Sequence, residues 1–245
     1  MPDTRSHRGP DPRDGEAFGP SSLPALRAAV ADLSWLLSRG YAPVSALKLV
    51  GDRWGLTERQ RMAVRRSACS DEARARRLAC QVATMAVDGR ELWIDGFNVV
   101  TTLEACLGGG VVLHCRDGTY RDLAGVHGTY RRVVETLPAL ETLAVVLGEL
   151  RVRHARWFFD RPVSNSGRIR ALVEQTAAER SLAWSAELVD NPDPILKQSV
   201  EIVATADSAI LDAGPSWFNL ARHAIERASA SGRVIDLSDP SGRRT

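Results

Sequence analysis

Four aspartates each stand directly after an apolar run of the chain: Asp95, Asp160, Asp190 and Asp207. Carboxylates gathered at one place repel one another unless a cation lies between them. Mg²⁺ prefers oxygen ligands, keeps several waters and binds phosphates, and divalent ions activate water for phosphodiester cleavage. The pattern therefore predicts a Mg²⁺ or Mn²⁺ site that hydrolyses a phosphodiester. Each aspartate taken singly is more typical of a turn or a helix cap, so it is their number that favours a site.

Short apolar runs that alternate with longer helical stretches must position these aspartates. Helices are expected over 129–153, restarting at Pro138, and over 167–180. Strands are expected at 92–94, 111–114, 156–159, 186–189, 202–205 and 234–237. Strands alternating with helices are typical of the α/β class with a doubly wound, mainly parallel sheet of Rossmann-like type, in which the carboxyl ends of the strands share one edge. The aspartates are expected to meet at that edge.

The first third of the chain has a helical pattern instead. Leucine and valine recur at spacings of three and four from Leu23 to Leu37, which is the stripe of an amphipathic helix. Thr57 with Gln60 forms a capping box at the start of a later helix. The predicted parts of the chain are a disordered tail (1–20), a small helical domain of helix-turn-helix type (21–88) and an α/β domain (89–240).

The helical domain is expected to be basic. Residues 21–80 hold 11 Lys and Arg against 5 Asp and Glu, whereas residues 81–245 hold 18 against 21. The turn near Trp54 and the arginines beyond it suit a module that grips the backbone of a nucleic acid. A solvated basic face that packs against the neighbouring domain explains the same residues equally well.

Composition excludes several classes of protein. The 245 residues carry a net charge of +2 and are 44% hydrophobic, which excludes a chain disordered throughout and a polycationic coat protein. No apolar run approaches the ~20 residues that span a bilayer, and the N-terminus lacks the apolar core of a signal peptide. We therefore expect a cytoplasmic protein with no membrane partner, and the sequence leaves a homo-oligomer open.

Two segments resemble motifs of a nuclease family. Residues 94–99, Ile-Asp-Gly-Phe-Asn-Val, resemble the first motif of PIN-like nucleases of the NYN and YacP type. Residues 203–208 resemble their later strand, and residues 158–160 fall where that family has a middle strand ending in aspartate. The resemblance implies a PIN-like fold and a metal-dependent nuclease activity.

The same resemblance implies roles for single residues. Asp95, Asp160 and Asp207 would be catalytic residues and metal ligands. Asn98 would orient the first aspartate or bind phosphate, and Ser208 would assist the last aspartate.

Many PIN-like nucleases carry a further acid in the metal site. Glu104, Asp122 and Glu135 compete for this role in the present sequence. Asp122 is favoured because it sits in a polar loop beyond a predicted strand, close to a glycine.

The polar loop after the third predicted strand suits a phosphate. Ser164 and Asn165 are expected either to cap the helix that follows or to bind a phosphate there, with Arg161 and Arg168 as counter-charges. His127, which lies near two glycines, is either a general acid or base or a plain helix-entry residue.

The chain as a whole is identified as a member of the prokaryotic domain-of-unknown-function family numbered four hundred thirty-four. This resemblance rests on residues 45–53, 56–61, 117–125 and 160–167, extends over about 23–220, and implies no activity. The residues together predict a Mg²⁺- or Mn²⁺-dependent nuclease that acts on RNA. The alternative is a non-catalytic regulatory protein that binds a nucleic acid or a nucleotide.

Overall fold

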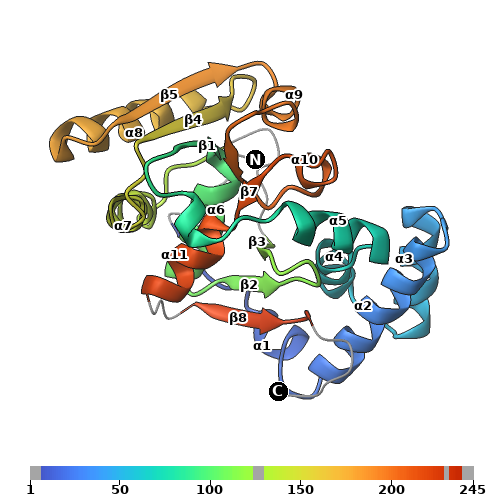
Figure 1. Cartoon of the computed structure of the whole chain (residues 1–245). Helices are drawn as coiled ribbons and strands as arrows, with labels where there is room; N and C mark the ends of the chain where they lie inside the picture. Colours follow the sequence, from blue (N-terminus) through green and yellow to red (C-terminus); the bar gives the residue numbers. More distant parts are fainter. Residues whose placement is uncertain (1–6, 124–129, 229–231, 239–245) are drawn as a thin grey trace.

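A five-stranded parallel sheet forms the centre of the computed structural model, which describes residues 7–123, 130–228 and 232–238. Its strand order is β5-β4-β1-β6-β7, and every neighbouring pair is parallel (Figure 1). The strands are β1 (Glu91–Asp95), β4 (His154–Asp160), β5 (Trp184–Val189), β6 (Ile202–Ala204) and β7 (Trp217–Phe218). The expected mixed α/β fold with a mainly parallel sheet is therefore confirmed. His127 lies outside the described residues.

Helices cover both faces of this sheet because successive strand side chains point to opposite sides. In β1, Leu92 and Ile94 pack into the large apolar cluster on one face, whereas Trp93 packs into a smaller cluster on the other. The first face is covered by α6 (Gly96–Leu107), α7 (Thr136–Glu149), α8 (Ser166–Arg180) and α11 (Leu220–Ala228). The second face is covered by α9 (Pro192–Lys197) and α10 (Ser208–Leu211).

Two predicted strands belong to a second sheet, which corrects the expectation of one sheet. This sheet has the order β3-β2-β8, with β2 antiparallel to β3 and parallel to β8. Both faces of β2 are buried, since Val112 packs with the large cluster and Leu113 packs with the N-terminal helices. An apolar run shows that a strand is buried but does not identify its partner. The strands are β2 (Val111–His114), β3 (Tyr120–Asp122) and β8 (Arg233–Asp236).

The N-terminal helices pack on the outer face of that second sheet. Their apolar side chains share one cluster with β2 and β8, so the small sheet lies between these helices and α6 with α11 (Figure 1). The capping box is confirmed, since the Gln60 N–H donates to Thr57 Oγ1 and the Thr57 N–H donates to Gln60 Oε1. The division of the chain near residue 88 stays a prediction. The helices are α2 (Leu23–Ser38), α3 (Pro43–Arg53), α4 (Glu58–Ser67) and α5 (Asp71–Cys80).

The expected disordered tail needs correction over residues 7–20, which pack on the rest of the protein. This segment contains the short helix α1 (Asp14–Ala17), and Phe18 is buried among the N-terminal helices. Asp14 is 2% exposed and accepts from the Arg59 guanidinium, with 3.0 Å between Nη2 and Oδ2. The polar composition predicted a tail because the partners of these charged residues lie far away in the sequence, where local composition does not reveal them.

One further expectation differs from the structure. The helix expected over 129–153 is shorter, because α7 begins at Thr136 and ends at Glu149. Trp217 and Phe218 form β7, and the Trp217 indole N–H donates to the Arg77 carbonyl at 2.6 Å. No helix within the described ranges has the length and apolarity required to cross a membrane.

Candidate active site

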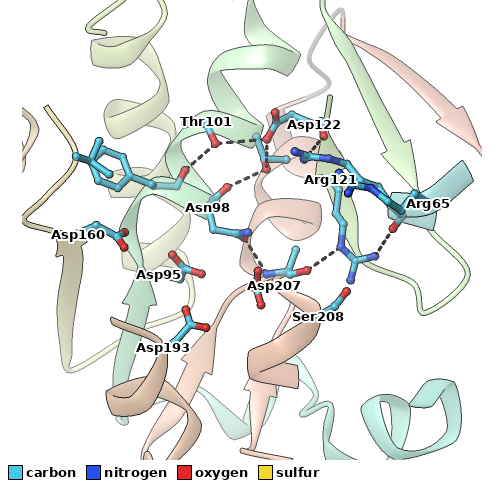
Figure 2. A pocket seen from close by; sticks show the side chains of 15 residues that line it. Arg65, Asp95, Asn98, Thr101, Arg121, Asp122, Asp160, Asp193, Asp207 and Ser208 are labelled. Atoms are coloured by element: carbon cyan, nitrogen blue, oxygen red, sulfur yellow. Dashed lines mark hydrogen bonds between the residues drawn. The ribbon is translucent and has the colours of Figure 1, made fainter. Parts of the chain in front are cut away.

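A pocket of about 500 Å³ opens at the carboxyl edge of the five-stranded sheet (Figure 2). Five aspartates and three arginines contribute to its wall. The charged lining residues are Asp95, Asp122, Asp160, Asp193, Asp207, Arg65, Arg66 and Arg121.

The chain order of the sheet explains why aspartates meet here. From β1 the chain builds β4 and β5 on one side, then returns to build β6 and β7 on the other. Such a reversal creates a crevice outside the strand ends, which is where open α/β sheets bind ligands. Asp95 ends β1, Asp160 ends β4, and Asp207 follows β6. Asp95 and Asp207 therefore flank the reversal point.

Hydrogen bonds between two loops fix this side of the pocket. The Thr205 hydroxyl donates to Asp95 Oδ2 at 2.7 Å, and the Asp207 N–H donates to Thr205 Oγ1 at 3.0 Å. Asn98 acts on the loop after β6, since its Oδ1 accepts from the Ala206 N–H at 2.8 Å. Asn98 thus holds the segment that carries Asp207, and Thr205, which belongs to the second motif but had no role assigned from the sequence, holds Asp95.

The first motif also needs its glycine. A Cβ at Gly96 would collide with the ring of Phe159, so β1 can turn directly into α6 only with glycine at this position. Asp207 has a local role as well, because its Oδ1 accepts from the N–H groups of Ala209 and Ile210 and caps α10. The Asp207 carboxylate therefore caps α10 and also lines the pocket.

Burial leaves negative charge poorly compensated in this pocket. Burial raises the pKa of Asp95 to about 7; the hydrogen bond from Thr205 opposes this rise, and the carboxylates of Asp207 and Asp160 add to it. Burial also raises the pKa of Asp160, with a further contribution from Asp193. Opposite charge placed nearby restores the ionised form of a buried carboxylate. A cation between these groups would therefore relieve their mutual repulsion.

The structure separates the three candidates for a further acid. Asp122 lines the pocket, with its Oδ2 3.3 Å from the hydroxyls of Thr101 and Thr102. Glu104 is fully buried elsewhere, where it pairs with Arg8 and accepts from the Tyr130 hydroxyl at 2.5 Å.

Glu135, the third candidate, belongs to the same N-terminal contact. One of its carboxylate oxygens lies 2.9 Å from the His7 ring, and the other accepts from the Arg8 N–H at 3.3 Å. Glu104 and Glu135 therefore anchor the segment that begins at residue 7.

Val163 lines the aspartate pocket, but the polar residues of the loop after β4 that the sequence indicated lie outside it. Arg161 donates to the Leu188 carbonyl at 2.8 Å and pairs with Asp190, so neither Arg161 nor Asp190 lines it. The Ser164 carbonyl accepts from the Tyr130 N–H, and its side chain is also outside the pocket.

Asn165 and Arg168 line a second pocket of about 300 Å³, together with Tyr130, Arg131 and Arg132. Asn165 donates to the Tyr130 carbonyl at 2.8 Å and adopts a left-handed conformation before α8. Ser208, by contrast, lines the aspartate pocket.

Several pocket residues were not predicted as site residues. Asp193 lies in the first turn of α9. Arg65 and Arg66, which the sequence marked only as part of a basic helix, lie in the last turn of α4. Arg121 is a buried residue of β3, and the only hint of its role is a second charged residue four positions earlier, Asp117.

Arg121 ties three parts of the pocket wall together. Its guanidinium donates to the Ala206 carbonyl at 2.7 Å, to the Arg66 carbonyl at 2.9 Å and to Asp117 Oδ2 at 2.7 Å. Burial lowers the pKa of Arg121, and the Asp117 carboxylate more than reverses that effect. Arg77 donates to the same carboxylate at 2.6 Å, so this buried cluster stays ionised.

The donor groups of the pocket suit a hydrated Mg²⁺ or Mn²⁺ ion. Among the residues that the structure describes, no three His, Cys, Asp or Glu side chains lie close enough together to hold one ion. Mg²⁺ commonly binds through one or two carboxylates and completes its shell with water and substrate phosphates. The carboxylates on one side of the pocket fit this mode, with a half-buried Asp95 whose charge is poorly compensated and with the remaining aspartates acting through water.

Comparison with known proteins supports the assignment to families of unknown function. The family model described as "Domain of unknown function (DUF5616)" matches residues 84–223, and the one described as "Protein of unknown function (DUF434)" matches residues 25–79. The second match covers the helical region alone, a shorter extent than the sequence motifs suggested. The chain is 29% identical over 187 residues to "Uncharacterized protein MJ0935" of Methanocaldococcus jannaschii. The aligned region covers 76% of this chain and 89% of that relative. No solved structure matches the chain.

Proposed function

We propose that this chain, which belongs to the family described as "Domain of unknown function (DUF5616)", is a divalent-metal-dependent nuclease that hydrolyses RNA. One observation carries the proposal: aspartates from three separate strand ends and two further elements line a single pocket at the reversal point of a parallel sheet. Carboxylates brought together from distant parts of a chain repel one another, and a bound cation would offset this repulsion. The PIN-like relationship is part of this proposal.

The roles of the side chains follow from their contacts. Asp95 and Asp207, on either side of the reversal point, would hold Mg²⁺ or Mn²⁺, with Asp160 and Asp122 acting through water. A bound ion of this kind lowers the pKa of water and neutralises charge on a phosphate. Thr205 would keep Asp95 in one orientation, and Asn98 would keep the loop that carries Asp207 in place.

A second function is favoured by a specific observation. The Asp207 carboxylate already caps α10, and the described side chains form no compact three-ligand group. A regulatory protein that binds a nucleic acid or nucleotide in this pocket without cleaving it would have these features too.

Cleavage of labelled single-stranded RNA with Mn²⁺ distinguishes the two functions. Asp95→Asn removes the buried charge, whereas Asp190→Asn, the matched control, changes an aspartate that also follows a strand but lies outside the pocket. We expect Asp95→Asn to slow cleavage by about 100-fold or more and Asp190→Asn to retain it. Salt-sensitive RNA binding without cleavage in the wild type would contradict the nuclease proposal and support the regulatory one.

A further inference from the structure

The arginines of the N-terminal helices are mostly engaged within the protein. Arg59 and Arg61, on the helix expected to recognise nucleic acid, pair with Asp14 and Asp52. Arg77 is buried against Asp117 and Asp212. Carboxylates within the protein therefore neutralise the charge of these three arginines.

Arg65 and Arg66 differ from these residues. Both line the aspartate pocket, and neither has an ion-pair partner in the part of the chain that the structure describes. Arg66 donates to the Asp122 carbonyl at 2.6 Å, while the exposed Arg65 is left to solvent and the pocket. Cations in the last turn of a helix favour its dipole, but that effect does not require them to face a pocket.

The position of these two arginines is fixed by buried groups. Arg121 donates both to the Arg66 carbonyl and to the Ala206 carbonyl, next to Asp207. The end of α4, which belongs to the N-terminal helical region, is thereby attached to the loop after β6, which belongs to the α/β region. The helical region thus forms one wall of the pocket.

In the described part of the chain, no ion pair joins Arg65 or Arg121 to Asp95, Asp160 or Asp193 across this pocket, and Arg121 is already paired with Asp117. Figure 2 shows Arg65 and Arg121 on one side and Asp95, Asp160 and Asp193 on the other. A ligand that binds to both walls must place negative charge beside the arginines and must also bind a cation that the carboxylates hold. A phosphate does both, because arginine binds phosphate through paired N–H donors and Mg²⁺ binds phosphate oxygens.

We propose that Arg65 and Arg66 form the phosphate-binding wall of this pocket and that their ligand is the backbone of single-stranded RNA. The choice of RNA rests on the proposed function, whereas the phosphate-binding wall rests on the geometry alone. A pocket of about 500 Å³ has the size of a small-molecule site and admits a nucleotide of a single strand. The helical region therefore supplies binding residues to the site of the α/β region.

Equilibrium binding tests this proposal separately from cleavage. The probe is a short fluorescein-labelled single-stranded RNA with phosphorothioate linkages, measured by anisotropy with Mg²⁺ over a range of salt concentrations. We expect Arg65→Gln to weaken binding by about tenfold and to lower the slope of log affinity against log salt by about 1. Arg65→Lys should recover part of the loss, since it keeps the charge but not the paired donors.

Arg39→Gln is the matched control. Arg39 is also an exposed arginine at the end of an N-terminal helix, but it lies over the Trp35 ring, 3.6 Å from its centroid, and outside the pocket. We expect it to change RNA affinity by less than about twofold. Unchanged melting temperatures would show that neither variant is misfolded.

The outcomes separate this proposal from the nuclease activity. If Arg65→Gln weakens binding no more than Arg39→Gln, the phosphate-binding wall is refuted even where the wild type cleaves RNA. If Arg65→Gln alone weakens binding and the wild type cleaves nothing, the wall is supported and the nuclease activity is refuted. If the wild type binds no single-stranded RNA with Mg²⁺, the proposed ligand is wrong.

Discussion

Replacing Asp95 by asparagine should stabilise the metal-free protein at alkaline pH. The carboxylate is half-buried near Asp160 and Asp207, and its pKa is raised from an ordinary value of 3.8 to about 7. Asparagine removes the charge, and its side-chain oxygen still accepts the hydroxyl of Thr205, which donates to Asp95 at 2.7 Å. The substitution therefore removes the free-energy cost of burying a charge and keeps the hydrogen bond from Thr205 that holds the side chain.

The size of this effect follows from the pKa difference. A rise of about 3 units corresponds to about 4 kcal/mol, because each unit is worth about 1.4 kcal/mol. Asp95 is partly exposed to the pocket, and water there screens some of the cost. We therefore expect a gain in the free energy of unfolding of about 2–4 kcal/mol at pH 8.

The stability difference between Asp95→Asn and the wild type depends on pH. Between pH 3.8 and about 7 the folded protein binds more protons at Asp95 than the unfolded chain does, so wild-type stability falls as pH rises through this window. Asparagine does not titrate, and the difference between variant and wild type should grow across the same window. Near pH 4 the two proteins should be equally stable.

Urea unfolding in EDTA at several pH values measures this difference. Asp190→Asn serves as the control because Asp190 is largely exposed and pairs only with the exposed Arg161 among the described residues; its effect should stay within about 0.5 kcal/mol. An Asp95→Asn protein less stable than wild type at pH 8 would refute the view that the pocket holds uncompensated charge.

Three other predictions concern the ion and the buried contacts. Mg²⁺ or Mn²⁺ should raise the melting temperature of the wild type at pH 8, by an amount that shrinks below pH 7 and is absent in Asp95→Asn; an equal shift in both proteins would place the ion elsewhere. Glu104→Ala should cost about 3 kcal/mol or more in urea unfolding, because it leaves Arg8 and the Tyr130 hydroxyl without their acceptor, while the Mn²⁺-induced shift persists; loss of that shift would place Glu104 in the site. Asp117→Ala should cost about 3–5 kcal/mol by stranding Arg121 in the interior, and a change below 1 kcal/mol would contradict its assigned role.

Local sequence pattern was enough to place the aspartates at strand ends. Asp95 and Asp160 each end an apolar strand, and parallel strands bring their carboxyl ends to one edge whatever lies around them. The same reasoning found β2 but assigned it to the wrong sheet, since burial on both faces does not specify a neighbour.

The remaining pocket wall depends on contacts that leave no local pattern. β3 is short and carries Arg121 and Asp122, so it lacks the alternation typical of a strand, although all its residues are buried. Arg65 reaches the pocket because Arg121 attaches α4 to the loop after β6, a contact between segments that are distant in sequence. Arg161 looked equally suitable in the sequence, but it binds the Leu188 carbonyl instead.

The location of Mn²⁺ in a crystal tests the central claim most directly. Crystals of the wild type and of Asp95→Asn would be soaked in Mn²⁺, and anomalous difference maps would be compared. We predict one strong peak in the wild type beside Asp95 and Asp207, with water completing its shell, and no peak there in the variant. A wild-type pocket without Mn²⁺, or a peak of equal height in the variant, would contradict a metal centre at this sheet edge.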